Sequence, residues 1–418
     1  MKVLKPKGNW NFNRNNTIFN YDWWLVACIC LMCVLGLAFL ASSLSTRTQA
    51  DYQKEFFKQL LLGVGLGGIG AFILSRIDYH FLLKKSDLIL KINFILLGFI
   101  GIFAIFLYFR TLGMLPLDSA TFKTNFLQGL SFLPVKPVTA NGAIRWIDFP
   151  FIPNFQPSEF SKIAILLYFS NAFWLNENSP VKWMTLKRPL YSLVLSAFLI
   201  LIQPDLGTVV LIIGIILSSM WTNKIPFKII FYIGFLALAV ALASSTLVKY
   251  RAERVNAFFD PNSTSAAQIQ GVQNAIRSGG MWGKGYGNST FKQRSGILIE
   301  QSTDAIISII GEEAGYFGTL TFLSLYGVFL WRALKIANEA PDSGGRSLAT
   351  GIGVWIVAQA VINISGNLGL LPLKGIPLPF VSQGGSSMMI NLLAVGILLN
   401  ISRQKVEVNR RPALKPAV

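Results

Sequence analysis

The sequence predicts an all-α integral membrane protein with about ten transmembrane helices. Two features of its composition indicate this class: hydrophobic residues make up 53% of the chain and charged residues only 13%. A third is the arrangement of the apolar residues in runs long enough to cross a bilayer, with basic connectors between them. The formal net charge of +18 follows largely from those connectors, so we expect no nucleic-acid partner.

Short breaks marked by glycine, proline or charged residues separate the predicted spans. The run Gly63-x-Gly65-x-x-Gly68 matches a dinucleotide-binding pattern by letter only, because no strand precedes it, and close helix packing is its expected role. The eighth span is expected to bend near Gly315–Gly318. In chain order the spans are predicted at 23–43, 57–74, 88–109, 158–175, a pair broken at 203–207, 229–247, from 304 onward, 348–368 and 386–401.

Basic residues predict which end of each span faces the cytoplasm. With the N-terminus inside, the short connectors rich in Lys and Arg all fall on the inner side, at 76–87, 177–188, 222–228 and 332–347. The chain then divides into a cytoplasmic tail, a polytopic membrane domain and a basic cytoplasmic tail, at 1–21, 22–403 and 404–418.

Two long segments fall on the outer side of the membrane. The first, 110–157, contains several prolines and is expected to be irregular. The second, 249–303, lies between the seventh and eighth spans and is the largest hydrophilic piece of the chain. The candidate chemistry gathers on this outer face, whereas no Walker A motif supports an ATP-driven pump.

A stripe of acidic and hydroxyl residues enters the eighth span. Glu300, Asp304, Ser308 and Glu312 recur every four residues, so a helix would place them on one face. Ionisable groups at the edge of a bilayer are costly unless they are paired or hydrated, which makes this stripe a candidate functional site. The alternative is a set of helix caps with a buried ion pair.

Cations and exposed backbone are predicted on the same face as Asp304. The glycine loop 279–289 offers backbone N–H groups that can approach a phosphate, and the turn 377–387 offers the hydroxyls of Ser382 and Ser386. A carboxylate among cations suits an anionic lipid-linked substrate, since it can act as a base while the cations stabilise a departing diphosphate. The alternative is that the cations pair with Glu159, Asp205, Glu312, Glu313 or lipid headgroups. The candidate cations are Arg145, Lys162, Arg251, Arg254, Lys284 and Lys292.

At these residues the chain resembles the SEDS family of bacterial cell-wall glycosyltransferases, which includes FtsW, RodA and SpoVE. The resemblance extends from Asp22 to about Arg403. It depends on motifs that follow one another in order, at 141–147, 156–162, 203–208, 278–289, 303–304, 311–315, 367–372 and 377–387.

The resemblance implies ten transmembrane helices with a large outer loop between the seventh and eighth. It implies polymerisation of lipid II into glycan strands, with Asp304 as the catalytic acid and Arg145, Lys162 and Lys292 at matching basic positions. From our own interpretation we add Arg254, Lys284, Glu300, Ser382 and Ser386 as substrate-binding candidates. We expect no protein metal site, although a divalent cation such as Mg²⁺ or Mn²⁺ on the diphosphate is compatible with this chemistry.

The resemblance also implies partners and a location. Members work with a class B penicillin-binding protein that crosslinks the strand, among other membrane proteins of the division or elongation machinery. We expect a multi-pass protein of the bacterial plasma membrane with both termini inside. The Gly287-Asn-Ser289 run and the turn 371–375 are more similar to the division member than to RodA.

The chain departs from the family pattern at several positions, and two functional alternatives stay open. Ser302 and Ala305 flank the Thr-Asp motif where many members have His and Phe, Ile299 replaces a proline and Gln383 a tyrosine. A lipid II flippase would use the polar stripe and the broken span pair as a path. A scaffold that only recruits wall enzymes would tolerate changes at all of these polar residues.

Overall fold

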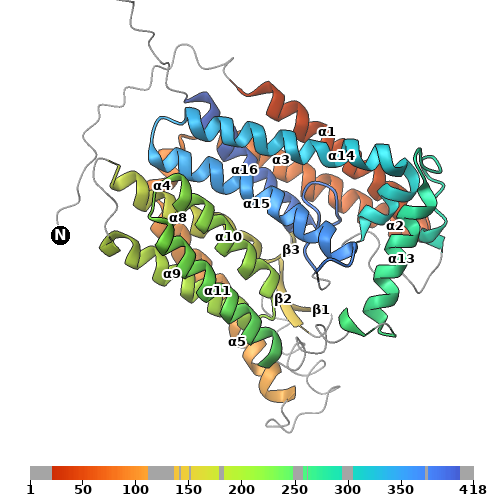
Figure 1. Cartoon of the computed structure of the whole chain (residues 1–418), viewed down its shortest axis with the longest axis horizontal. Helices are drawn as coiled ribbons and strands as arrows, with labels where there is room; N and C mark the ends of the chain where they lie inside the picture. The colour runs from red at the N-terminus through yellow and green to blue at the C-terminus, as the bar shows by residue number, and fades with distance from the viewer. Residues whose placement is uncertain are drawn as a thin grey trace, which may run out of the picture.

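The computed structural model describes residues 21–111, 136–140, 143–149, 152–177, 183–247, 258–260, 262–293, 305–371 and 375–404. Long helices lie side by side in one bundle, and a shorter helix stands at one end of it (Figure 1).

The bounds of the elements are as follows. The first group is α1 (Trp23–Leu44), α2 (Gln49–Phe57), the π-helix η2 (Lys58–Gly65), α3 (Leu66–Arg76), α4 (Tyr79–Lys84) and α5 (Ser86–Thr111). Three strands follow, β1 (Lys136–Ala140), β2 (Ala143–Phe149) and β3 (Ile152–Phe155), and then α8 (Pro157–Leu175), α9 (Trp183–Ile202), α10 (Leu206–Thr222) and α11 (Phe227–Leu247). The last group is α13 (Thr264–Gly279), the 3₁₀ turn η4 (Phe291–Gln293), α14 (Ile306–Glu339), α15 (Ser343–Asn367) and α16 (Gly385–Arg403).

Within the described residues, 8 helical stretches are long and apolar enough to cross a membrane, and α10 is a shorter apolar helix of 17 residues. Helix α8 is largely buried at the centre of the bundle, against α5, α9, α10 and α15. The prediction of a helical multi-pass membrane protein is thereby confirmed. The number of ten crossings and the position of the large outer loop stay predictions.

The helices run between two ends of the bundle. At the end that we call the tail end, Asp22 before α1 accepts hydrogen bonds from Arg332 of α14, whose Nε lies 3.1 and 3.0 Å from the two carboxylate oxygens. At the same end, Arg403 of α16 donates to the hydroxyl of Tyr21 over 3.3 Å. At the opposite end, the loop end, Gln273 of α13 donates to the carbonyl of Leu368 over 2.8 Å.

A small antiparallel sheet with the order β1-β2-β3 occupies part of the segment that we expected to be irregular. Its strands have 5, 7 and 4 residues, too short to stand out among the surrounding prolines. Strand β2 is fixed by Ile144 and Ile147, which are buried against Ile100 of α5. Pro137 lies in β1, an edge strand, where its missing N–H does not interrupt the sheet.

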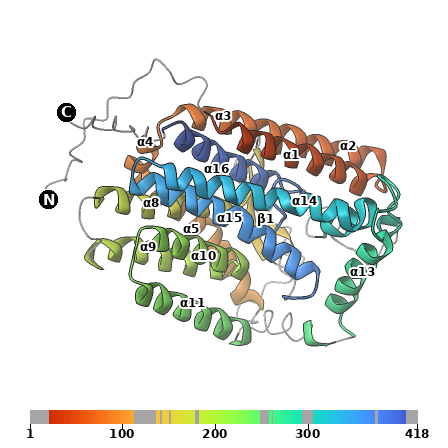
Figure 2. The same ribbon diagram turned by 45° about the horizontal axis from the view of Figure 1, so that its top comes forward.

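Small residues bring α3 and α16 into close contact. A Cβ on Gly67 would come within 2.8 Å of Leu392, and one on Gly396 within 2.4 Å of the Ala71 carbonyl oxygen. These two glycines therefore serve helix packing. Of the three glycines for which the sequence predicted this role, a Cβ on Gly63 would lie 3.3 Å from Met388 of α16, whereas one on Gly68 would meet nothing within 4 Å. In contrast, α11 lies at the edge of the bundle beside α10 (Figure 2).

Helix α14 is broken where a bend was predicted. Gly315 has φ 67° and ψ −168°, outside the helical region, so the helix loses backbone hydrogen bonds there. The glycine loop after α13 fills the break. The Gly280 carbonyl accepts from Tyr316 N over 2.9 Å, and Met281 O accepts from Phe317 N over 3.2 Å.

Candidate active site

The predicted catalytic acid, Asp304, lies outside the described residues, as do Glu300 and Arg254. The residues on both sides of the segment 294–304 are described. On one side, η4 ends at Gln293. On the other, Ala305 is fully buried and precedes the first residue of α14. The contacts of η4 and α14 therefore fix the two ends of the segment that carries Asp304.

The Glu312 side chain is buried on α14 and collects hydrogen bonds from the loop that precedes 294–304. Lys284 Nζ lies 2.6 Å from Oε1, and the Thr290 N–H and hydroxyl donate to the same oxygen over 3.1 and 2.8 Å. Ser289 donates its hydroxyl to Oε2, and Phe291 donates its N–H over 3.2 Å. A buried carboxylate with this many donors is fully compensated and anchors the loop to α14.

Glu313 forms a second, adjacent anchor. Its Oε1 accepts from the Ser42 hydroxyl of α1 and lies 3.3 Å from Lys292 Nζ. Lys292 also donates to the Ser42 hydroxyl over 3.1 Å and to the Gly287 carbonyl over 2.6 Å. All three side chains are buried, so α1, α14 and the start of η4 are joined at one point.

The glycine loop contacts α14 at the break and donates backbone hydrogen bonds there. Lys284 N donates to Glu312 O over 3.0 Å, Gly285 N to Glu313 O over 3.1 Å, and Gly283 N to the Gly279 carbonyl over 2.8 Å. From the sequence, the N–H groups of this loop were expected to be able to approach a phosphate. In the structure, the N–H groups of Lys284 and Gly285 bind carbonyls that the broken helix leaves unpaired, and that of Gly283 binds the last carbonyl of α13, so the glycines allow close backbone approach instead.

Lys162 on α8 is buried in an ion pair with Glu159, one turn earlier, at 2.8 Å. Its Nζ also donates to Gln359 Oε1 of α15 over 2.9 Å and lies 4.6 Å from the ring centre of Trp355. Gln359 in turn donates to the carbonyl of Pro377 over 2.9 Å. The lysine charge is therefore balanced inside the bundle, and Gln359 connects it to the turn before α16.

Arg145 on β2 reaches the break between α9 and α10. Its Nε and one terminal nitrogen donate to the carbonyls of Gln203 and Pro204 over 3.1 and 3.0 Å. Asp205 at the same break accepts from Gln156, Ser158 and Thr208, and caps α10. Among the described ion pairs, Lys162, Lys284 and Lys292 each have a carboxylate partner and Arg145 has none. The positive charges of the three lysines are thus offset by adjacent carboxylates, whereas the hydrogen bonds of Arg145 go to neutral carbonyls.

Of the two predicted hydroxyls before α16, Ser382 serves the turn itself. Its Oγ accepts the N–H of Leu378 over 2.9 Å, and the residue is buried. Ser386 lies in the first turn of α16 and is 6% exposed. The turn from Ile376 to Gly384 is therefore a compact structure that leads into α16, with Ser386 just beyond it.

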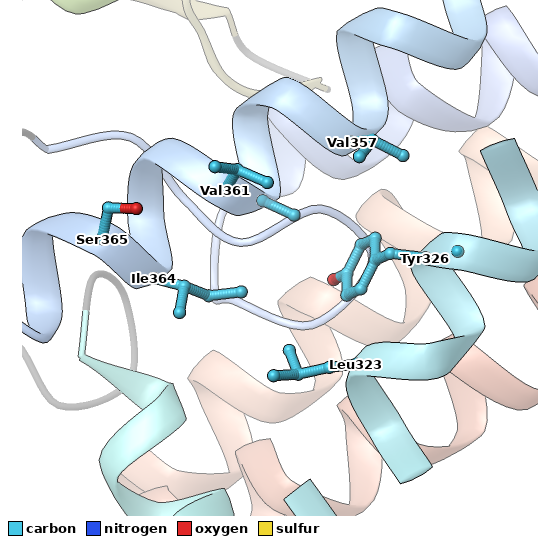
Figure 3. A pocket seen from close by; sticks show the side chains of 8 residues that line it. Leu323, Tyr326, Val357, Val361, Ile364 and Ser365 are labelled. Atoms are coloured by element: carbon cyan, nitrogen blue, oxygen red, sulfur yellow. The ribbon is translucent and has the colours of Figure 1, made fainter. Parts of the chain in front are cut away.

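An apolar groove lies between α14 and α15, and Figure 3 shows the side chains that line it. It encloses about 310 Å³. Its polar members are Ser365 and Tyr326, whose hydroxyl donates to the Pro379 carbonyl over 2.7 Å. The groove is thus in direct contact with the turn before α16. Within the described part of the chain, no three His, Cys, Asp or Glu side chains gather in a metal-binding arrangement.

A second titratable cluster lies at the tail end, outside the spans. His80 Nδ1 lies 2.7 Å from Asp78 Oδ1, and its Nε2 lies 2.7 Å from Asp342 Oδ2. Burial disfavours the imidazolium, but hydrogen bonds to the two carboxylates outweigh it and raise the pKa of His80 to about 9. At Asp78, the contacts with His80 likewise outweigh burial and lower the pKa of the carboxyl to about 2. The imidazolium clamps α4 to the α14–α15 connector.

Sequence reasoning missed Gln59 and Gln359, which hold the turn before α16, and Tyr326 beneath it. The available signal was a lone amide inside an apolar run, because a buried polar side chain needs a partner. The partner of Gln59 lies 323 residues away in the sequence, and no pattern pointed to it.

These features define the class: a polytopic membrane protein whose buried ion pairs anchor an extended loop at one end of the bundle. The chain belongs to the FtsW/RodA/SpoVE family, because the family model described as cell cycle protein matches residues 105–407, more than half of its length.

Individual relatives agree with that assignment. A protein of Geobacter sp. (strain M18) described as probable peptidoglycan glycosyltransferase FtsW is 35% identical over 91% of this chain and 96% of its own. The stage V sporulation protein E of Bacillus subtilis (strain 168) is 31% identical over 91% and 97%.

Solved structures share the fold. A chain from a structure titled "Structural coordination of polymerization and crosslinking by a peptidoglycan synthase complex" has a TM-score of 0.69 at 24% identity, with 93% of this chain and 99% of that chain covered. The rod shape determining protein RodA of Thermus thermophilus has a TM-score of 0.64 at 21% identity, with coverage of 93% and 99%.

Proposed function

We propose that this protein is a peptidoglycan glycosyltransferase that polymerises lipid II and releases undecaprenyl diphosphate. Family membership and the names of the full-length relatives support the reaction class. The observation that carries the proposal for the site is the double anchor at Glu312 and Glu313, which fixes the start of the segment that holds Asp304. A positioned carboxylate is what this transfer needs.

In the proposed reaction, Asp304 takes the proton from the 4-hydroxyl of the acceptor GlcNAc. The oxygen attacks the anomeric carbon of the donor MurNAc, the bond to the diphosphate breaks, and the configuration inverts from α to β. A cation near the departing diphosphate stabilises the developing charge. Arg145 is the described candidate best suited to this, because its hydrogen bonds go to neutral carbonyls. Lys162 is offset by Glu159.

The remaining predicted site residues fall into two groups, those proposed to contact the substrate and those whose side chains are bound within the protein. We propose that Ser386, together with Glu300 and Arg254 outside the described residues, contacts the sugar or phosphate groups. Lys284, Lys292 and Ser382 are bound within the protein, so we propose that they shape the site without touching the substrate. A divalent cation, Mg²⁺ or Mn²⁺, would enter with the diphosphate, and no proposed step depends on it.

A lipid II flippase is the second candidate function. It would use Glu312 and Glu313 as a polar path through the membrane. The contacts argue against this use, because both carboxylates are already neutralised by Lys284 and Lys292. The two functions separate in one assay with purified protein: a polymerase forms glycan chains from lipid II in detergent, where there is no second leaflet, and a flippase does not.

A crosslinking partner follows from the same proposal. We propose a class B penicillin-binding protein, in line with the synthase complex among the structural neighbours. The letters Ser289-x-x-Lys292 have the spacing of a transpeptidase pair, but here Ser289 donates to Glu312 and Lys292 to Glu313, so they form no nucleophile–base pair.

We further propose a septal role in the bacterial plasma membrane with both termini inside and the active site outside, and a RodA-type elongation role as the alternative. Adding the partner to the detergent assay tests whether polymerisation depends on it.

A further inference from the structure

The turn from Ile376 to Gly384, here called the clamped turn, is in contact with four separate helical elements, three through side chains and one through a close approach of its backbone. Asn363 and Gln359 of α15 donate to the carbonyls of Ile376 and Pro377 over 2.8 and 2.9 Å. Tyr326 of α14 donates to Pro379 O. On α1, a Cβ on Gly36 would come within 2.3 Å of the Phe380 carbonyl oxygen.

The backbone inside the clamped turn is strained. Phe380 has φ 66°, in the left-handed region that side chains other than those of Gly and Asn rarely adopt. The residue is 1% exposed and packs against Phe329 at a ring distance of 6.2 Å. Strain of this kind persists only where the surroundings over-determine it, and it gathers at functional sites.

The fourth element is the π-helix η2, and its contribution is Gln59. The Gln59 amide makes two hydrogen bonds to the end of the clamped turn: Nε2 donates to Ser382 O over 3.3 Å, and Oε1 accepts from Gly384 N over 3.1 Å. The side chain is 2% exposed.

The run of π-helix around Gln59 is itself unusual. It covers 8 residues, whereas such helices are rare, mostly single turns, and frequently found at functional sites. An amide that only joins two membrane helices does not require a widened helix or a strained partner. The π-helix around Gln59 and the strained backbone at Phe380 together indicate that these contacts serve to hold the clamped turn in one position.

The clamped turn lies between a buried ion pair and Ser386, which we propose contacts the substrate. Gln359 links it to Lys162 on one side, and α16 with Ser386 begins directly after it on the other. We propose that Gln59 is a positioning residue for lipid II binding: it fixes the end of the clamped turn so that the first turn of α16 meets the substrate. This inference rests on the proposed function, since it names a further residue of the same site.

The test measures lipid II binding and turnover in Gln59→Met, which keeps the size of the side chain and removes both hydrogen bonds. A pre-formed contact surface that becomes mobile weakens ground-state and transition-state binding alike, so KM should rise about tenfold with kcat within about twofold. A merely structural role lowers the active fraction, which reduces kcat and leaves KM unchanged, and that result would overturn the proposal. Gln53→Met, at an exposed position in α2, is the matched control and should leave both constants unchanged.

Two further variants keep the test decisive. If Gln59→Met does not fold, Tyr326→Phe removes the hydroxyl contact that α14 makes with Pro379 of the same turn and should give the same rise in KM. In the Asp304→Asn background, the Kd for lipid II should rise about tenfold on adding Gln59→Met. An unchanged Kd overturns the inference about Gln59. Full polymerisation by Asp304→Asn alone would instead overturn the proposed function and leave the binding comparison valid.

Discussion

The close contact between the glycine loop and the broken helix α14 can be tested with two glycines of nearly equal conformation. Gly283 has φ 82° and Gly287 has φ 81°, so an alanine at either position carries the same backbone strain of about 1–2 kcal/mol. Their surroundings differ. A Cβ on Gly283 would lie 2.1 Å from the Glu313 carbonyl oxygen, whereas one on Gly287 meets nothing within 4 Å.

Gly283→Ala must therefore push the loop away from α14, and Gly287→Ala need not. The displaced loop loses the hydrogen bonds of Lys284 N and Gly285 N to the helix carbonyls, worth about 1 kcal/mol each. We expect Gly283→Ala to lower the free energy of local opening by about 3–4 kcal/mol in total, and Gly287→Ala by about 1–2 kcal/mol.

Native-state proteolysis at Lys284, which lies inside the loop, reads this opening directly, because the cleavage rate follows the population of the open loop. A difference of about 2 kcal/mol between the variants corresponds to cleavage about 30-fold faster in Gly283→Ala than in Gly287→Ala. Equal cleavage rates would refute the claim that this loop is seated on the break in α14.

Three further predictions concern charged side chains. Glu312→Gln should lower the free energy of unfolding by about 3 kcal/mol, because it leaves Lys284 without its partner. In the Glu312→Gln background, Lys284→Met should cost much less stability than it costs in the wild type, because the ion pair is already broken. Additive losses of stability in a thermal-unfolding double-mutant cycle would contradict this coupling. Arg145→Ala should lower kcat/KM about 100-fold with little change in Tm, because this side chain is proposed to stabilise the diphosphate. Lys162→Met should mainly lower Tm, because it leaves Glu159 buried and unpaired. The reverse pattern would assign the diphosphate contact to Lys162. His80 has a folded pKa of about 9, above its ordinary value, so its stabilising contribution is complete below about pH 6.5 and is lost as the pH rises through about 9. The Tm difference between wild type and His80→Gln should therefore be largest in acid and shrink above about pH 9, and a pH-independent difference would exclude the imidazolium clamp.

The helical bundle was predictable from the sequence because its signal is local. An apolar run long enough to cross a bilayer shows itself within one window, and the bend at Gly315 followed from nearby glycines. The three-stranded sheet escaped prediction because β3 has only 4 residues and lies among prolines. Its stability comes from Ile144 and Ile147 packing on α5, a contact that no local pattern displays.

The site was predictable in its residue types and not in its pairings. The sequence named Glu159 among the possible partners of the cations, and its ion pair with Lys162, one helical turn along α8, exists. Lys292 and Ser42 lie 250 residues apart, and their contact follows only from the packing of α1 on the loop. From the sequence we proposed a phosphate as the partner of the glycine loop. The bend in α14 was predicted separately, and no local pattern showed that the carbonyls exposed at this bend accept hydrogen bonds from the same loop.

The central claim is that a carboxylate at position 304 acts as the base in glycan polymerisation, and the most direct measurement compares purified wild type with Asp304→Asn on lipid II in detergent. The asparagine keeps the size of the side chain and cannot accept the proton. We predict glycan chains from wild type, a loss of at least about 100-fold in rate for Asp304→Asn, and an unchanged Tm. Chains formed at the wild-type rate by Asp304→Asn would contradict the mechanism.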